Sequence, residues 1–142
     1  MANKVIYLIG ALVNPYIPKL ANKIRALGYD CYDDWWSASE IADKWFDDYR
    51  KQRGLNYKDA LASWASQHIF SFDKKHLDRA DIVILVMPAG KSGHLELGYS
   101  IGRGKTGYIL FLEEPEKLDQ MHNFADEIFM SEEDLLKVLN VN

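Results

Sequence analysis

The feature that most constrains the fold is the run IVILVM at residues 82–87, which is apolar throughout and rich in β-branched side chains. β-branched residues favour strands, and an uninterrupted apolar run is typical of a strand buried on both faces of a sheet. Two further short apolar runs lie at residues 5–9 and 108–112. Segments with helical periodicity separate the three runs, so the sequence predicts parallel strands joined by helical crossovers.

The complete set of expected elements follows the same alternation. Strands are predicted at 5–9, 29–33, 82–87, 108–112 and, at the edge, 127–130, and helices at 17–27, 38–53, 57–78, 93–103 and from 131 onward. This order predicts an α/β protein with a flavodoxin-like or Rossmann-like three-layer fold and a mostly parallel five-stranded sheet. A chain of 142 residues matches one domain, which is expected to cover residues 1–142.

Composition excludes several classes of protein. The net charge is −4 and there is no basic block, which disfavours a nucleic acid polymer as the main partner. The single cysteine, Cys31, rules out an intrachain disulfide, and no Cys/His spacing predicts a metal site. No apolar run approaches a membrane span, and the first residues lack the apolar core of a signal peptide. We therefore expect a cytoplasmic protein with no membrane partner, metal or cofactor.

The glycine-rich stretch at residues 90–107 contains two partial phosphate-binding patterns. The sequence around Gly90-Lys91-Ser92 fails the phosphate-loop pattern because position 85 is leucine. Residues 102–107 spell G-x-G-x-x-G, but they follow a helical segment and precede a strand, which reverses the order of a dinucleotide fingerprint. We interpret these glycines as a helix stop and a tight turn.

Polar and aromatic residues gather in the loops that follow the predicted strands, where ligands bind in open α/β sheets. These residues are Asn14, Asp33, Asp34, Trp35, Trp36, Lys91, Ser92, His94, Glu113 and Glu114. Turn chemistry accounts for Asn and Asp in loops but not for two adjacent tryptophans. Trp35 is a candidate platform for a nucleobase, an interaction worth about 1–3 kcal/mol, or else it packs against the following helix.

Glu96 admits two interpretations. If Gly93 is the N-cap of the following helix, Glu96 occupies the third helical position and closes a capping box. Alternatively, its carboxylate points into the cleft and attacks an anomeric carbon to form a covalent glycosyl intermediate. In a retaining glycosidase a second carboxyl group lies about 5–5.5 Å away.

Three motifs in this order resemble the nucleoside 2-deoxyribosyltransferase family and the related 2′-deoxynucleoside 5′-monophosphate N-hydrolases. They are YLIG at 7–10, RADIVILVMPAG at 79–90 and HLELGYSIGRGK at 94–105. Together they cover about a fifth of the chain, and the Trp-rich segment 35–76 lies outside them.

The resemblance implies a role for each matching residue. Glu96 matches the nucleophile that attacks C1′ of the deoxyribose, and Asp81 matches an aspartate that assists near the base or the nucleophile. Tyr7 matches a tyrosine that holds the catalytic carboxylate, and Gly10 allows the first loop to approach the sugar. Asn14 and Asp33, in the loops above, complete the expected substrate contacts.

One departure from the family pattern concerns the substrate's 5′ end. Six residues before the nucleophile the transferases carry an aspartate and the nucleotide hydrolases tend to carry a serine, whereas this chain has Gly90. Lys91 and Ser92 follow it, and an ammonium group and a hydroxyl near a helix N-terminus suit an anion. His94 is a further candidate for contact with a phosphate or for an acid. These residues point to a nucleoside 5′-monophosphate.

The sequence therefore predicts an enzyme that cleaves the N-glycosidic bond of a 2′-deoxynucleoside or its 5′-monophosphate and transfers the sugar to another base or to water. The resemblance also implies a homodimer or larger homo-oligomer. Two alternatives remain open: a non-catalytic nucleotide-binding module that senses or sequesters its ligand, and an interaction protein whose Trp-rich helices bind a partner. Trp45 and Trp64, inside predicted helices, are expected in the core or in a subunit interface.

Overall fold

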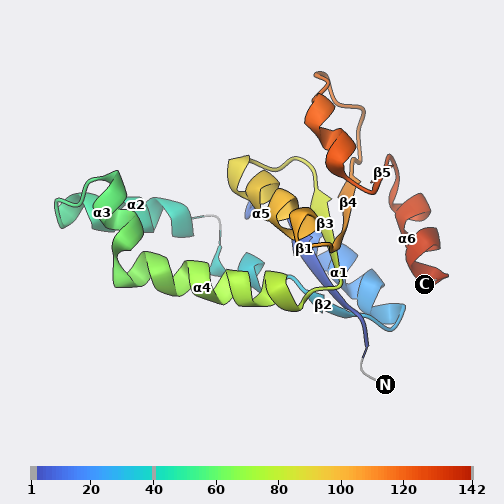
Figure 1. The fold of residues 1–142 in the computed structure, drawn as a ribbon, viewed down its shortest axis with the longest axis horizontal. Helices are drawn as coiled ribbons and strands as arrows, with labels where there is room; N and C mark the ends of the chain where they lie inside the picture. Colours follow the sequence, from blue (N-terminus) through green and yellow to red (C-terminus); the bar gives the residue numbers. More distant parts are fainter. Residues whose placement is uncertain (1–2, 40, 142) are drawn as a thin grey trace.

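The protein folds as a parallel sheet between layers of helices, in a computed structural model that describes residues 3–39 and 41–141 (Figure 1). The strands are β1 (Val5–Ile9), β2 (Asp30–Tyr32), β3 (Ile82–Val86), β4 (Thr106–Leu110) and β5 (Glu127–Phe129). Their order in the sheet is β2-β1-β3-β4-β5, and every neighbouring pair is parallel. The expected flavodoxin-like three-layer fold is confirmed, with an entirely parallel five-stranded sheet.

Helices connect the strands in the order that the sequence predicts. They are α1 (Tyr16–Ala26), α2 (Ala42–Gln52), α3 (Tyr57–Ala62), α4 (Trp64–Arg79), α5 (Lys91–Gly102) and α6 (Glu132–Asn140), with two 3₁₀ helices, η1 (Asp34–Ala38) and η2 (Gln120–Phe124). None of these helices, within the part of the chain that the structure describes, is long and apolar enough to cross a membrane.

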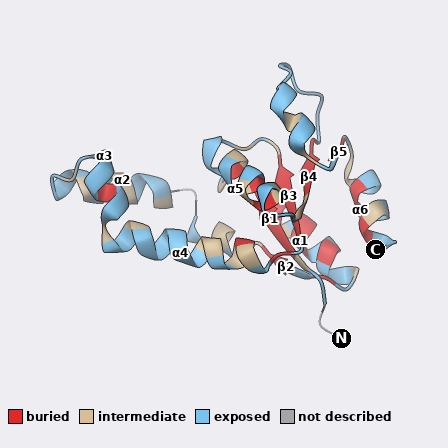
Figure 2. Ribbon diagram, in the orientation of Figure 1, coloured by how far each residue is buried: buried red, intermediate tan, exposed pale blue. Residues whose placement is uncertain are grey.

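Two apolar clusters hold the layers together, one on each face of the sheet. Because side chains alternate along a strand, Ile6 and Leu8 of β1 face α1 and α6, while Tyr7 and Ile9 face α4 and α5. The central strand β3 is buried along its whole length, as its apolar run predicts. Figure 2 shows the buried residues concentrated in this sheet.

Several element boundaries differ from the predicted ones; α2, for example, begins at Ala42 instead of residue 38. The helix expected at 57–78 is divided at Ser63, whose extended backbone ends α3 and whose hydroxyl accepts a hydrogen bond from Ser66 N at 3.3 Å to cap α4. The fourth strand begins at Thr106 instead of 108. Gly107 lies within this strand. A Cβ there would lie 2.5 Å from Cγ1 of Ile101, so glycine lets α5 pack this closely on β4. The start of α5 also differs from the prediction, and this start determines which helical position Glu96 occupies.

An arm made of α2, α3 and the amino-terminal half of α4 projects from the sheet (Figure 1). It carries large apolar side chains that are solvent-exposed, among them Trp45 at 64% and Trp64 at 93% exposure. The expectation that these tryptophans lie in the core is therefore wrong for this chain taken alone. Their placement in a subunit interface stays a prediction.

Candidate active site

Glu96 lies in the second turn of α5, because the helix begins three residues earlier than a Gly93 cap would place it. The N-cap is Gly90, with extended backbone angles, and no side chain caps the helix start. The capping-box interpretation of Glu96 is therefore wrong. Instead, the carboxyl group is largely buried against the face of the sheet that α4 and α5 cover.

Tyr7 of β1 lies directly against this carboxyl group. Its side chain is 2% exposed, and its hydroxyl is hydrogen-bonded to Glu96. Burial, together with the nearby charge of Glu96, raises the pKa of Tyr7 far above its usual range. The hydroxyl therefore stays protonated and donates to the carboxylate. The structure thus brings Tyr7 and Glu96 together, and the roles that the resemblance implies for them stay predictions.

A second carboxyl group belongs to Asp73 of α4, which sequence reasoning missed. Asp73 is half-buried and its pKa is raised by burial, and its charge acts on both Tyr7 and Glu96. A signal for it existed, because Asp73 lies one helical turn before Leu77, which packs in the core. A carboxylate on the core-facing stripe of a helix is a candidate site residue.

The pKa of Glu96 is raised from 4.5 to about 7. Burial is the main cause and the neighbouring Asp73 charge adds to it, while the hydrogen bond from Tyr7 opposes the shift. One carboxyl oxygen, Oε2, is buried without a hydrogen-bond partner among the described residues. Buried polar atoms normally have a hydrogen-bond partner, so an unpartnered buried carboxyl oxygen is unusual and marks Glu96 as a candidate functional residue.

Aromatic rings border the carboxyl pair on the β2 side. The rings of Tyr7 and Tyr32 lie 5.1 Å apart, and His76 of α4 stacks on Tyr32 at 3.9 Å with an interplanar angle of 8°. Burial raises the pKa of Tyr32 to about 12, with the charge of Asp73 adding to the effect. The carboxyl groups therefore lie between two helices and beside a wall of aromatic side chains.

Asp81 does not share this site, contrary to the prediction that it assists Glu96. Its carboxylate accepts a hydrogen bond from Val5 N at 2.8 Å, at the amino ends of β1 and β3. Asp81 precedes β3, whereas α5 follows the opposite end of that strand. The second carboxyl group beside Glu96 is Asp73.

Two of the loop residues predicted to contact the substrate form hydrogen bonds within the fold instead. The side chain of Asn14 accepts a hydrogen bond from Tyr16 N at 3.0 Å, at the start of α1. The indole N–H of Trp35 donates to Leu8 O at 2.7 Å, and the ring packs against both apolar clusters. Trp35 therefore closes the carboxyl end of β1, and its interpretation as a packing residue is the one that these contacts support.

Asp33 and Gly10, also predicted to lie at the substrate, have structural partners as well. Asp33 forms an ion pair with Arg25 at 2.6 Å, and its side chain is only 11% exposed. Gly10 lies so close to α1 and β3 that a Cβ would be 2.8 Å from Cδ1 of Ile17 and 3.4 Å from Val86 O. A side chain at position 10 would therefore have to displace the end of the Ile17 side chain.

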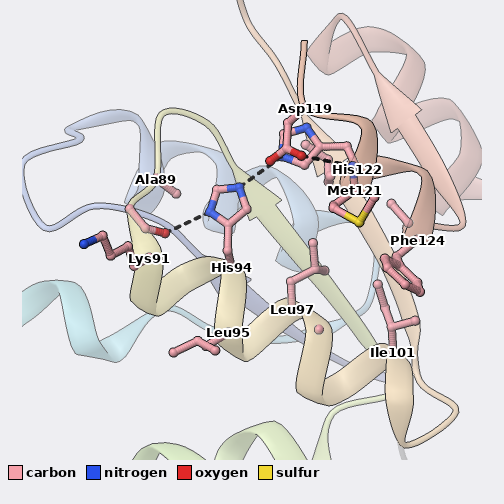
Figure 3. A pocket seen from close by; sticks show the side chains of 14 residues that line it. Ala89, Lys91, His94, Leu95, Leu97, Ile101, Asp119, Met121, His122 and Phe124 are labelled. Carbon is pink, nitrogen blue, oxygen red and sulfur yellow. Dashed lines mark hydrogen bonds and ion pairs between the residues drawn. The ribbon is translucent and has the colours of Figure 1, made fainter. Parts of the chain in front are cut away.

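Lys91, Ser92 and His94 lie at the exposed start of α5, away from the carboxyl pair. Lys91 and His94 line an open cavity of about 760 Å³ between α5 and η2, drawn in Figure 3. The residues that line this cavity do not include Glu96. The structure therefore brings Glu96 together with Tyr7 and Asp73, but it does not bring the predicted anion-binding residues into the same cavity.

No protein-family model matches the sequence, and no curated protein matches it. Solved structures do share its fold. A conserved protein from Enterococcus faecalis V583 is 18% identical with a TM-score of 0.69, and the match covers 99% of each chain.

Two other structures that share the fold are enzymes. A 2-deoxyribosyltransferase from the psychrotolerant bacterium Bacillus psychrosaccharolyticus is 19% identical with a TM-score of 0.64, over 95% of each chain. A CMP N-glycosidase from Clostridium botulinum is 16% identical with a TM-score of 0.59, over 96% of this chain and 99% of that one. At these identities the likeness establishes the fold.

Proposed function

We propose that the protein belongs with the nucleoside 2-deoxyribosyltransferases and nucleotide N-glycosidases, and that it cleaves the N-glycosidic bond of a 2′-deoxynucleoside or its 5′-monophosphate. The observation that carries this proposal is the buried Glu96 carboxyl group, which Tyr7 hydrogen-bonds and whose Oε2 has no partner among the described residues. Asp73 supplies a nearby second carboxyl group, as glycosidic chemistry requires. The likeness to a 2-deoxyribosyltransferase and a CMP N-glycosidase supports the choice of substrate class.

In the first step the Glu96 carboxylate attacks C1′ of the sugar. A bond forms between a carboxylate oxygen and C1′ while the bond from C1′ to the base nitrogen breaks, and its electron pair leaves with the base. A proton then neutralises that nitrogen. Asp73, whose pKa burial raises, is the nearby carboxyl group that can supply this proton.

In the second step water or another base attacks C1′, Asp73 accepts a proton from the attacking group, and Glu96 leaves as a carboxylate. Tyr7 acts as a positioning residue, because its protonated hydroxyl fixes the carboxylate in both steps. The burial that raises the pKa of Glu96 also keeps bulk water from the covalent intermediate. The mechanism calls for no metal or organic cofactor at Glu96.

We also propose that the protein forms a homodimer or larger homo-oligomer through its arm. Side chains as large as Trp64, at 93% exposure, and Trp45, at 64%, are unusual on a surface that stays in water. Aromatic side chains of this kind are enriched at the centres of protein interfaces.

The test incubates the protein with 2′-deoxynucleosides and with their 5′-monophosphates, with and without a second free base. Released base and new nucleoside are followed by chromatography. We expect Glu96→Ala to lower the rate by at least about 10³-fold, because it removes the nucleophile. Mass spectrometry of acid-quenched protein should detect a deoxyribosyl group on Glu96 in the wild type.

Asp81→Asn provides the matched control. It also removes a carboxylate, but from the amino ends of β1 and β3, where Asp81 accepts a hydrogen bond from Val5 N. Its rate should stay near that of the wild type, whereas Asp73→Asn should be slow. Absence of base release by the wild type, or full release by Glu96→Ala, would overturn the proposal. Nucleotide binding that survives Glu96→Gln without turnover would instead identify a non-catalytic binding module.

A further inference from the structure

A second group of titratable side chains lies outside the Glu96 site. His94 of α5 meets Asp119 and His122 of the segment that forms η2 (Figure 3). The Nε2 atoms of the two histidines are 3.0 Å apart, and Asp119 Oδ2 lies 3.6 Å from His122 Nε2. One ligand atom from each of the three residues falls within 4.8 Å of the others.

The hydrogen bonds of His94 define its tautomer. Its Nδ1 lies 2.8 Å from Gly90 O, and a carbonyl oxygen only accepts, so Nδ1 carries the hydrogen. In a neutral imidazole Nε2 then has a lone pair, and it points at His122 Nε2. Two ring nitrogens this close need either a proton or a cation between them. A hydrogen bond to a backbone carbonyl is also the usual outer partner of a metal-binding histidine.

The other two side chains are held in place in the same manner. Asp119 Oδ1 accepts a hydrogen bond from Met121 N at 3.0 Å, which leaves Oδ2 directed at His122. The His122 ring packs against Phe111 at 5.8 Å and is only 14% exposed. The three side chains therefore need little reorganisation to converge on one ion.

We propose that His94, His122 and Asp119 bind a divalent transition-metal ion of the Zn²⁺ class. Two imidazoles and one carboxylate suit Zn²⁺ and its neighbours in the first transition row, and disfavour Mg²⁺ and Ca²⁺. With Zn–N bonds of about 2.0–2.1 Å, two nitrogens of a tetrahedral site lie about 3.3–3.4 Å apart, so the rings must separate only slightly. The separation between Asp119 Oδ2 and His122 Nε2, 3.6 Å, is already close to that of a ligand pair.

Three protein ligands leave a fourth position open, and the site borders the cavity of about 760 Å³. Water or an anionic group of a bound molecule can fill that position. The ion would also tie η2 to α5, the helix that carries Glu96. The site is independent of the proposed enzymatic function, because it rests on contacts that do not include Glu96.

The test uses the full-length protein without a histidine tag, freed of metal with a chelator. Co²⁺ is titrated while its visible absorption is recorded, and Zn²⁺ then competes for the site. We expect saturable binding of one ion per chain and a melting temperature that rises with Zn²⁺. His94→Ala and His122→Ala should each weaken binding by at least about tenfold, because outer-shell changes alone cost 10–100-fold.

His68→Ala is the matched control, since His68 is exposed on α4 in the arm. It should bind Co²⁺ as the wild type does. If His122→Ala loses its fold by circular dichroism, His94→Ala and Asp119→Asn decide the question, because both remove side chains from more open positions. Absence of saturable binding, or equal weakening by His68→Ala, would overturn the proposal.

Discussion

The burial of Glu96 predicts a pH-dependent change in the stability of the whole protein. Its pKa is about 7 in the folded state against 4.5 when exposed, so between these values the folded state holds a proton that the unfolded state has lost. The free energy of unfolding therefore falls as the pH rises from about 4.5 to 7 and levels off above. At 1.36 kcal/mol per pH unit, the loss due to this one group is about 3 kcal/mol.

Glu96→Gln isolates this contribution. Glutamine has nearly the same shape, it still offers Tyr7 an acceptor oxygen, and it does not ionise. The variant should therefore gain about 3 kcal/mol in unfolding free energy relative to the wild type when the pH is raised from 4.5 to 8. The measurement is urea unfolding at several pH values, with protein concentration fixed and a chelator present so that no ion binds near His94.

Glu116→Gln is the control for this series, because Glu116 is exposed in the loop after β4. It removes the same chemical group without removing a buried carboxyl, so its pH dependence should follow that of the wild type. A constant difference between Glu96→Gln and the wild type from pH 4.5 to 8 would refute the reasoning, since it would mean that Glu96 ionises freely in the folded protein.

Four further substitutions test packing and assembly. Gly107→Ala should lower the unfolding free energy by about 1–3 kcal/mol, because its Cβ would lie 2.5 Å from a side chain of α5. Gly98 lies in α5, and a Cβ there would meet nothing within 4 Å. Gly98→Ala should therefore raise the unfolding free energy by up to about 1 kcal/mol, and urea unfolding compares the two glycine variants. Trp35→Phe should cost about 1–3 kcal/mol by the same assay, because Leu8 O loses its indole donor; no change would show that water replaces it. Trp64→Glu should reduce the mass measured by light scattering if the arm is a subunit interface, and an unchanged oligomer would exclude Trp64 from it.

The sequence alone determined the architecture of the protein. Short apolar runs separated by helical segments specify parallel strands with crossovers, because a strand buried on both faces must be apolar on both. The long run at 82–87 became β3, the fully buried centre of the sheet. The sequence also singled out Tyr7 and Glu96, through the motifs that carry the family resemblance, and the structure brings these two side chains together.

Only the tertiary structure decided which side chains meet. Asp73 reaches Glu96 because α4 and α5 pack side by side on one face of the sheet, a fact that no local pattern encodes. Asp81 looked equally suitable in the sequence. It lies at the amino ends of the parallel strands, however, whereas the helix that carries Glu96 follows the carboxyl end of β3. His94 and His122 are 28 residues apart and meet only through the packing of η2 on α5. Local periodicity specifies elements, whereas contacts between elements depend on how their surfaces pack.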